Sequence, residues 1–103
     1  MDVVRDFVRG AVTVHVLHHA AETAVHGAWM AQELAHHGHA ISPGTLYPLL
    51  HRLEGAGLLT SHHEVADGRA RRLYTITPTG RQALDRLRAA VAELAGEVLP
   101  HAR

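Results

Sequence analysis

The spacing of apolar and polar residues predicts a long helix at the start of the chain. Residues 3–20 contain one glycine and no proline, and the run from Val12 to Leu17 is apolar on nearly every side. A helix that is apolar all round is buried on more than one face. We therefore expect this helix to contact its own core on one side and a second subunit or a ligand on the other.

A second helix is predicted to begin at His26 and Gly27 and to end at residues 36–38. Its inward positions recur at helical spacing and are Met30, Ala31, Leu34 and Ala35. Trp29 lies off this stripe, so it either packs against a neighbouring helix or is exposed in an interface or pocket. The segments 22–25 and 39–41 are predicted to be short connections.

Residues 42–59 form the segment with the clearest helix signals. Ser42 is predicted to be the N-cap, its hydroxyl accepting a backbone N–H, and Pro43 falls at the first helical position. Gly55 and Gly57 end the helix. The inward stripe consists of Leu46, Leu49, Leu50 and Leu53, and the opposite face carries Thr45, Tyr47, Pro48, His51 and Arg52. These polar groups suit base edges in the major groove, and the two short helices together indicate a helix-turn-helix.

The pattern then changes from helical spacing to alternation. Residues 58–65 and 69–77 are two predicted strands, and Asp67-Gly68 between them is a strong hairpin signal. One face of the second strand carries Arg72, Tyr74 and Ile76, and the other carries Arg69, Arg71, Leu73 and Thr75. A helix-turn-helix followed by such a ribbon is a winged helix, whose arginines can reach phosphates or the minor groove.

Thr77 and Pro78 are predicted to begin a final helix of roughly 20 residues, about 30 Å long. Its apolar residues recur at intervals of three and four, as in a heptad seam, which favours a dimer in which the first and last helices of both chains interlock. The candidate dimer contacts are Val12, Val16, Leu84, Leu87, Val91, Leu94 and Val98. The predicted fold is therefore mainly α with a small β-hairpin: a winged helix-turn-helix domain over 1–77, a dimerisation helix over 78–99 and a disordered tail over 100–103.

Length and composition agree with one small intracellular domain. The chain has 103 residues, of which 47% are hydrophobic, enough for a modest core that gains from a partner chain. Charged residues interrupt the first apolar positions, no apolar run is long enough to cross a membrane, and there is no cysteine. We therefore expect a cytoplasmic protein without a signal peptide, membrane contact or disulfides.

Charge argues against indiscriminate binding to polyanions. Ten arginines balance ten acidic residues, there is no lysine, and the formal net charge is zero. The segment 42–81 is mildly basic, with five arginines against three acidic residues, so we expect the basic surface to lie there. No cysteine nucleophile, carboxylate pair or glycine-rich phosphate loop is visible, and the sequence predicts neither an enzyme nor a cofactor.

Eleven histidines are the unusual feature of the composition. His15 and His19 are one helical turn apart, a usable metal-ligand spacing, with His18 beside them. A second cluster lies at residues 36, 37 and 39, and the pair His62-His63 in the ribbon is weaker because neighbouring strand residues point to opposite faces. Metal binding, for which His15 and His19 are the best candidates, and pH sensing stand beside a third interpretation, in which histidine replaces lysine as a surface residue. No metal ligand set is assigned from the sequence.

With these residues in hand, the chain resembles the PadR family of bacterial transcriptional regulators over about residues 9–94. The central motif SPGTLYPLLHRLE, from Ser42 to Glu54, is specific because it combines an N-cap, two prolines and a tyrosine. The other shared features are Arg9-Gly10, His26-Gly27, Gly57-Leu58-Leu59, Asp67-Gly68-Arg69, the run from Arg71 to Tyr74, Thr77 and Gly80.

The resemblance implies a homodimeric repressor that binds a pseudo-palindromic DNA operator and is released by a small effector. It places Thr45, Tyr47, Pro48 and Arg52 at or near the major groove, and Ser42 and Gly44 near a phosphate. With the exposed His51, the candidate DNA contacts are Ser42, Gly44, Thr45, Tyr47, Pro48, His51 and Arg52 in the helix and Arg69, Arg71 and Arg72 in the wing. The chain departs from the family at Ala28, where tyrosine is usual, at Trp29, and in a last helix without aromatic residues, so no effector class carries over.

One alternative function has the same fold. A winged-helix module that binds protein and not DNA would have the same core, and the neutral net charge is compatible with it. The two are distinguished by the third helix, because a DNA-binding protein should lose affinity when Arg52 is replaced and should bind more weakly as salt rises.

Overall fold

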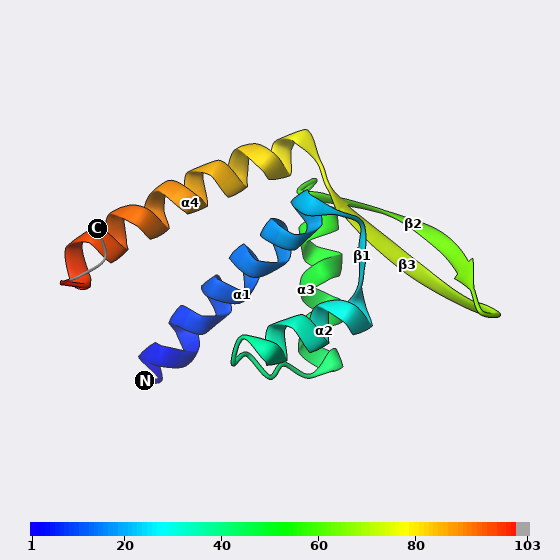
Figure 1. Ribbon diagram of the computed structural model, residues 1–103, viewed down its shortest axis with the longest axis horizontal. Helices are drawn as coiled ribbons and strands as arrows, with labels where there is room; N and C mark the ends of the chain where they lie inside the picture. Colours follow the sequence, from blue (N-terminus) through cyan, green and yellow to red (C-terminus); the bar gives the residue numbers. More distant parts are fainter. Residues whose placement is uncertain (101–103) are drawn as a thin grey trace.

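Over residues 1–100, which are those described by the computed structural model, four helices surround one end of a small antiparallel sheet (Figure 1). The elements in order are α1 (Val3–Glu22), β1 (Val25–His26), α2 (Gly27–His36), α3 (Pro43–Gly55), β2 (Leu59–Ala66), β3 (Arg69–Ile76) and α4 (Pro78–Val98). The β2–β3 ribbon extends away from the helices on one side, and α4 extends on the other. This arrangement confirms the predicted winged helix-turn-helix.

The helix boundaries follow from local chemistry. Asp2 caps α1 by accepting a hydrogen bond from the Arg5 backbone N–H, at 2.9 Å. Thr77 caps α4 in the same way, because its hydroxyl oxygen accepts from the Gly80 N–H at 2.9 Å. Ser42 occupies the N-cap position of α3, but the predicted side-chain cap is wrong: its hydroxyl lies 3.2 Å from the Thr45 hydroxyl and bonds no backbone N–H.

The sheet has one more strand than the sequence analysis predicts. The segment 22–25, expected to be a connection, contains the last residue of α1 and the start of β1, which pairs with β3 through Val25 opposite Tyr74. In the ribbon itself the register of β2 and β3 runs from Leu59 opposite Ile76 to Ala66 opposite Arg69. Asp67 and Gly68 both adopt positive φ, 53° and 73°, as the tight hairpin turn requires.

A single apolar core lies between α1, α2, α3 and the base of the sheet. Its members are Val12, Val16, Leu17, Ala20, Val25, Met30, Leu34, Leu46, Leu50, Leu53, Leu59, Tyr74, Ile76 and Leu84. Leu49, expected on the inward stripe of α3, is only partly buried. The core therefore fixes α3 by three leucines and leaves its opposite face in solvent.

Several apolar side chains of α1 and α4 remain uncovered. Val16 and Leu84, expected at the dimer interface, are instead buried inside the protomer, as is Val12. The other candidate contacts Val91, Leu94 and Val98 of α4 are exposed, and so are Val3, Val4 and Phe7 of α1, which were not among the candidates. The radius of gyration, 14.7 Å, exceeds the ~13 Å typical of a 100-residue domain, because the second half of α4 has no layer packed on it.

No helix within residues 1–100 is long and apolar enough to span a membrane. The predicted disordered tail, 100–103, falls outside the described residues from position 101 onward.

Candidate DNA-binding surface

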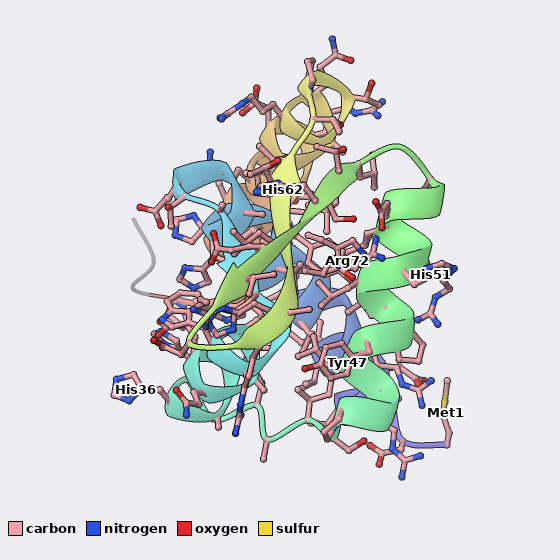
Figure 2. The ribbon with its side chains drawn as sticks, turned by 90° about the vertical axis from the view of Figure 1, so that its right-hand side faces the viewer. Met1, His36, Tyr47, His51, His62 and Arg72 are labelled. Atoms are coloured by element: carbon pink, nitrogen blue, oxygen red, sulfur yellow. The ribbon has the colours of Figure 1, made fainter. Side chains whose placement is uncertain are left out.

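α3 presents a polar ridge between two grooves. Leu46, Leu50 and Leu53 anchor its inner face, so the remaining residues are held outward. His51 points away from the ribbon on the outer side of the helix, whereas Tyr47 points toward the ribbon (Figure 2). The residues predicted to bind DNA are therefore divided between the two flanks of one helix.

The first groove lies between α3 and the wing and has a volume of about 780 Å³. It is lined by Tyr47 from α3, by His26 and Gly27 at the start of α2, and by the wing residues Arg69, Arg71 and Arg72. All three predicted wing arginines thus line the same groove as Tyr47 of α3. The contribution of His26 and Gly27 was not predicted, since it depends on β1 pairing with β3.

The second groove, about 610 Å³, lies on the other flank of α3, against α1. The predicted residues Ser42, Gly44, Thr45, Pro48 and Arg52 line it. Arg5 and Arg9 of α1 line it as well, which sequence reasoning missed because the basic segment appeared to begin at residue 42. Three arginines, Arg5, Arg9 and Arg52, and the N-terminal residues of α3 line the same groove, which makes it attractive to an anion such as a phosphate.

The wing is fastened to α3 by a polar network. The Ser61 hydroxyl donates to a Glu54 carboxylate oxygen at 2.5 Å and accepts from Arg72 at 3.0 Å. Arg72 also lies 2.8 Å from His63 Nε2 and 4.0 Å from Glu54. Both terminal nitrogens of Arg72 therefore make contacts within the protein, and Figure 2 shows Arg72 between the ribbon and α3.

Arg71 and Arg69, the other two wing arginines, differ from Arg72 in how many contacts they make within the protein. Arg71 lies 3.2 Å from His26 Nε2 and 3.7 Å from Glu64, so it is partly engaged. Arg69, at the tip, makes no side-chain hydrogen bond or ion pair with any described residue. Of the wing arginines, Arg69 is the most available to a phosphate.

Tyr47 has a structural contact in addition to its exposed edge. A methyl group on Gly27 would collide with the Tyr47 ring, since the two lie in van der Waals contact. The glycine at the start of α2 thus sets how closely α2 and α3 approach. Tyr47 is 46% exposed, which leaves one side of its ring to line the groove.

The two histidine clusters predicted separately meet across α1 and α2. His15 lies beside His37 and His39, with ring centroids 5.3 and 5.1 Å apart. Trp29 packs edge-on against His19 of α1 at 5.3 Å and stays 37% exposed, so it packs on a neighbouring helix and also reaches the surface.

Comparison with known proteins decides the family. The model of the "Transcriptional regulator PadR-like family" matches residues 16–86, which include α2, α3 and the whole wing. The chain belongs to the PadR family of transcriptional regulators. The resemblance predicted from the α3 motif is thereby confirmed, and with it the coarse function of DNA-binding regulation.

Relatives of this PadR-family chain span nearly its whole length. It is 62% identical over 95 residues to "Transcriptional regulator Rv3488" of Mycobacterium tuberculosis (strain ATCC 25618 / H37Rv), covering 92% of this chain and 89% of that protein. The crystal structure of a PadR family regulator from Eggerthella lenta DSM 2243 is similar at 32% identity and a TM-score of 0.77, with 97% and 95% of the two chains covered. A PadR-like regulator from Bacillus cereus strain ATCC 14579, 23% identical over 95% of this chain and 93% of its own, has the same fold at a TM-score of 0.78.

Proposed function

We propose that this PadR-family regulator is a homodimeric repressor that binds a pseudo-palindromic operator in the cytoplasm and is released by an effector. The observation that carries the proposal is the shared groove of α3 and the wing, which brings Tyr47 and three arginines to one concave surface. A helix in the major groove, with a basic ribbon following the adjacent backbone, is the docking geometry that such a surface fits.

The dimer is supported by the uncovered apolar side chains. Val91, Leu94 and Val98 lie on one face of α4, and Val3, Val4 and Phe7 lie near the free end of α1. Each such side chain contributes roughly 1.5–3 kcal/mol when it is fully buried, so leaving six of them in water is unfavourable. A second copy packing on both helices would cover them and present two α3 helices about 34–36 Å apart, one turn of DNA.

Release requires a ligand that binds the released form of the protein with higher affinity than the DNA-bound form. α1 takes part in the proposed interface and also lines the groove beside α3. A ligand that shifts α1 relative to α4 would therefore change the spacing of the two recognition helices. This link makes α1 the element through which an effector acts.

The proposal is tested by binding of the purified protein to the DNA that flanks its own gene, measured by footprinting and fluorescence anisotropy. Replacing Arg52 with alanine should weaken operator binding by about 1–3 kcal/mol if it contacts a base. Replacing Arg69 should reduce the slope of log affinity against log salt concentration by about one, as expected for the loss of one phosphate contact. Arg86→Ala is the matched control, since Arg86 is exposed on α4 away from α3. Equal affinity of the Arg52 and Arg86 variants for operator DNA at all salt concentrations would contradict the proposal.

A further inference from the structure

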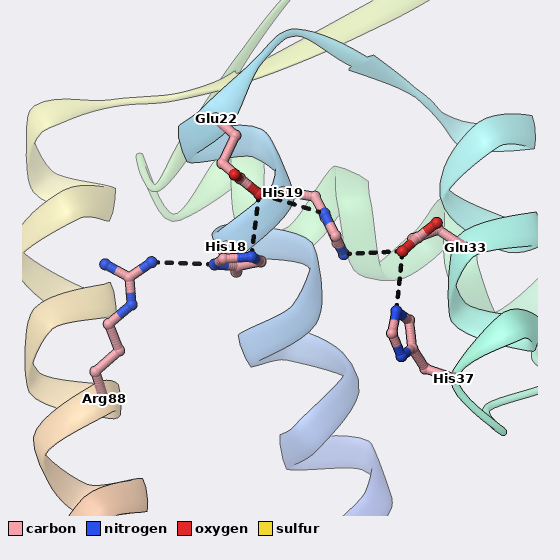
Figure 3. Close-up of polar contacts among 6 residues, drawn as sticks. All are labelled: His18, His19, Glu22, Glu33, His37 and Arg88. Atoms are coloured by element: carbon pink, nitrogen blue, oxygen red, sulfur yellow. Dashed lines mark hydrogen bonds and ion pairs between the residues drawn. The ribbon is translucent and has the colours of Figure 1, made fainter.

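The facing sides of α1 and α2 bring together a set of metal-ligating side chains that line neither groove of the candidate DNA-binding surface. His19 comes from the last turn of α1, Glu33 comes from α2, and His37, four residues after Glu33, is the C-cap residue of α2. The one-turn spacing of His15 and His19 indicates a metal site but identifies no acidic ligand. The packing of α2 on α1 brings Glu33 to His19 (Figure 3).

The three donor atoms already lie at distances that suit one ion. Glu33 Oε1 is 3.7 Å from His19 Nε2 and 2.9 Å from His37 Nε2, and all three atoms lie within 4.8 Å of one another. A tetrahedral zinc ion with bonds of about 2.0–2.2 Å separates neighbouring ligand atoms by roughly 3.3–3.5 Å. Small side-chain rotations would therefore bring all three atoms into coordination.

His19 is held in a state that favours a ligand. Its Nε2 atom is buried and has no hydrogen-bond partner among the described residues, a situation that ordinarily costs stability. Its other ring nitrogen, Nδ1, faces Glu22 Oε1 at 3.8 Å. The distance is too long for a hydrogen bond, but a small movement would let this carboxylate accept the Nδ1–H and orient the ring as in metal-binding histidines. Trp29 packs against the same ring.

His15 lies beside these three side chains. Its ring lies 5.3 Å from that of His37 and is stacked parallel to that of His19 at 6.2 Å. It contacts the ring of His37 from α1, one helical turn before His19. Rotation of its side chain could bring a fourth nitrogen to the same ion.

We propose that His19, Glu33 and His37 bind one divalent transition-metal ion per chain, of the Zn²⁺ or Ni²⁺ class, with His15 as the fourth ligand. Nitrogen and carboxylate donors without thiolate suit these ions. A second triad, His18, His19 and Glu22, shares His19 but is less suitable, because the Arg88 guanidinium lies 3.1 Å from His18 Nδ1 and repels a cation.

The site joins the two helices that transmit a signal to the DNA-binding surface. α1 belongs to the proposed dimer interface, and α2 contacts α3 through Gly27 and Tyr47. An ion that ties α1 to α2 would fix α3 relative to the dimer. Its effect on DNA binding rests on the proposed function, whereas the metal site itself does not.

The test is calorimetric titration of the untagged full-length protein with ZnCl₂ and NiCl₂, followed in parallel by Trp29 fluorescence. The wild type should bind one ion per chain with a change in Trp29 emission. His19→Ala, His37→Ala and the nearly isosteric Glu33→Gln should each weaken binding by more than ~10-fold. His36→Ala, on the same helix, and His62→Ala, in the wing, should bind as the wild type does, and circular dichroism confirms that each variant is folded.

Three results would overturn the site: no binding by the wild type, wild-type affinity in the His37 and Glu33 variants, or loss of binding only on removal of His18. Anisotropy with operator DNA then separates the two proposals. We expect Zn²⁺ to change the operator affinity of the wild type by at least ~5-fold and to leave that of His37→Ala unchanged. Zinc binding without any DNA binding would refute the proposed function and retain the metal site, and DNA binding without zinc binding would do the reverse.

Discussion

Replacing Leu94 with aspartate is expected to convert the protein to a monomer and to reduce operator affinity by about 10²–10⁴-fold. Leu94 lies at the middle of the uncovered apolar face of α4, between Val91 and Val98. A carboxylate there would have to be buried without a partner in the proposed dimer, which costs several kcal/mol. A monomer also loses the gain in affinity that comes from binding two linked half-sites.

Light scattering and sedimentation measure the oligomeric state of this variant, and anisotropy with the two-half-site operator measures its affinity. Ala89→Asp is the control, because it introduces the same charge on an exposed position of α4 that lies about 180° around the helix from the apolar seam. We expect Ala89→Asp to remain dimeric and to bind DNA as the wild type does. A dimeric Leu94→Asp with unchanged operator affinity would show that α4 is not the interface.

Replacing Gly80 with alanine is expected to lower the free energy of unfolding by about 1–3 kcal/mol, near the upper end of that range. Gly80 is buried in the first turn of α4, and a Cβ there would collide with the Leu58 carbonyl group and with the Ile76 side chain. A backbone carbonyl cannot move aside as the end of a side chain can. The collision would therefore separate α4 from the base of the wing.

Gly96→Ala provides the comparison within the same helix. A Cβ at Gly96 meets no atom within 4 Å, and alanine is favoured over glycine inside a helix by up to about 1 kcal/mol. Urea denaturation at a fixed protein concentration should place the midpoint of Gly80→Ala below that of the wild type and the midpoint of Gly96→Ala at or above it. Equal midpoints for the two variants would contradict the packing described for α4.

The elements with local signals were predictable from the sequence. The cap at Thr77, the proline at the start of α3 and the Asp67-Gly68 turn each act within a few residues, so the helices and the hairpin are correctly predicted to within one or two residues. β1 was missed because a strand of two residues is defined by its partner β3, nearly fifty positions away. No local pattern specifies such a pairing.

The surfaces were predictable only in part. Helical spacing identified the outer face of α3, but it did not reveal that Arg5 and Arg9 extend one groove or that Arg72 is held by Glu54 and Ser61. The heptad spacing likewise identifies the apolar face of α4 but does not show how much of that face packs within the same chain. The burial of Leu84 in the protomer was therefore not predicted. The meeting of Glu33 with His19 depends on the packing of two helices and has no sequence signature.

The network of Glu54, Ser61 and Arg72 has a consequence for how DNA sequences are distinguished. Because it fastens the wing to α3, the distance between α3, which we propose enters the major groove, and the wing, which we propose follows the neighbouring backbone, is set before DNA arrives. The protein then has little freedom to adapt to the local groove width, so the DNA has to deform to fit the protein. We therefore expect flanking base pairs that no side chain touches to affect affinity through their stiffness and minor-groove width.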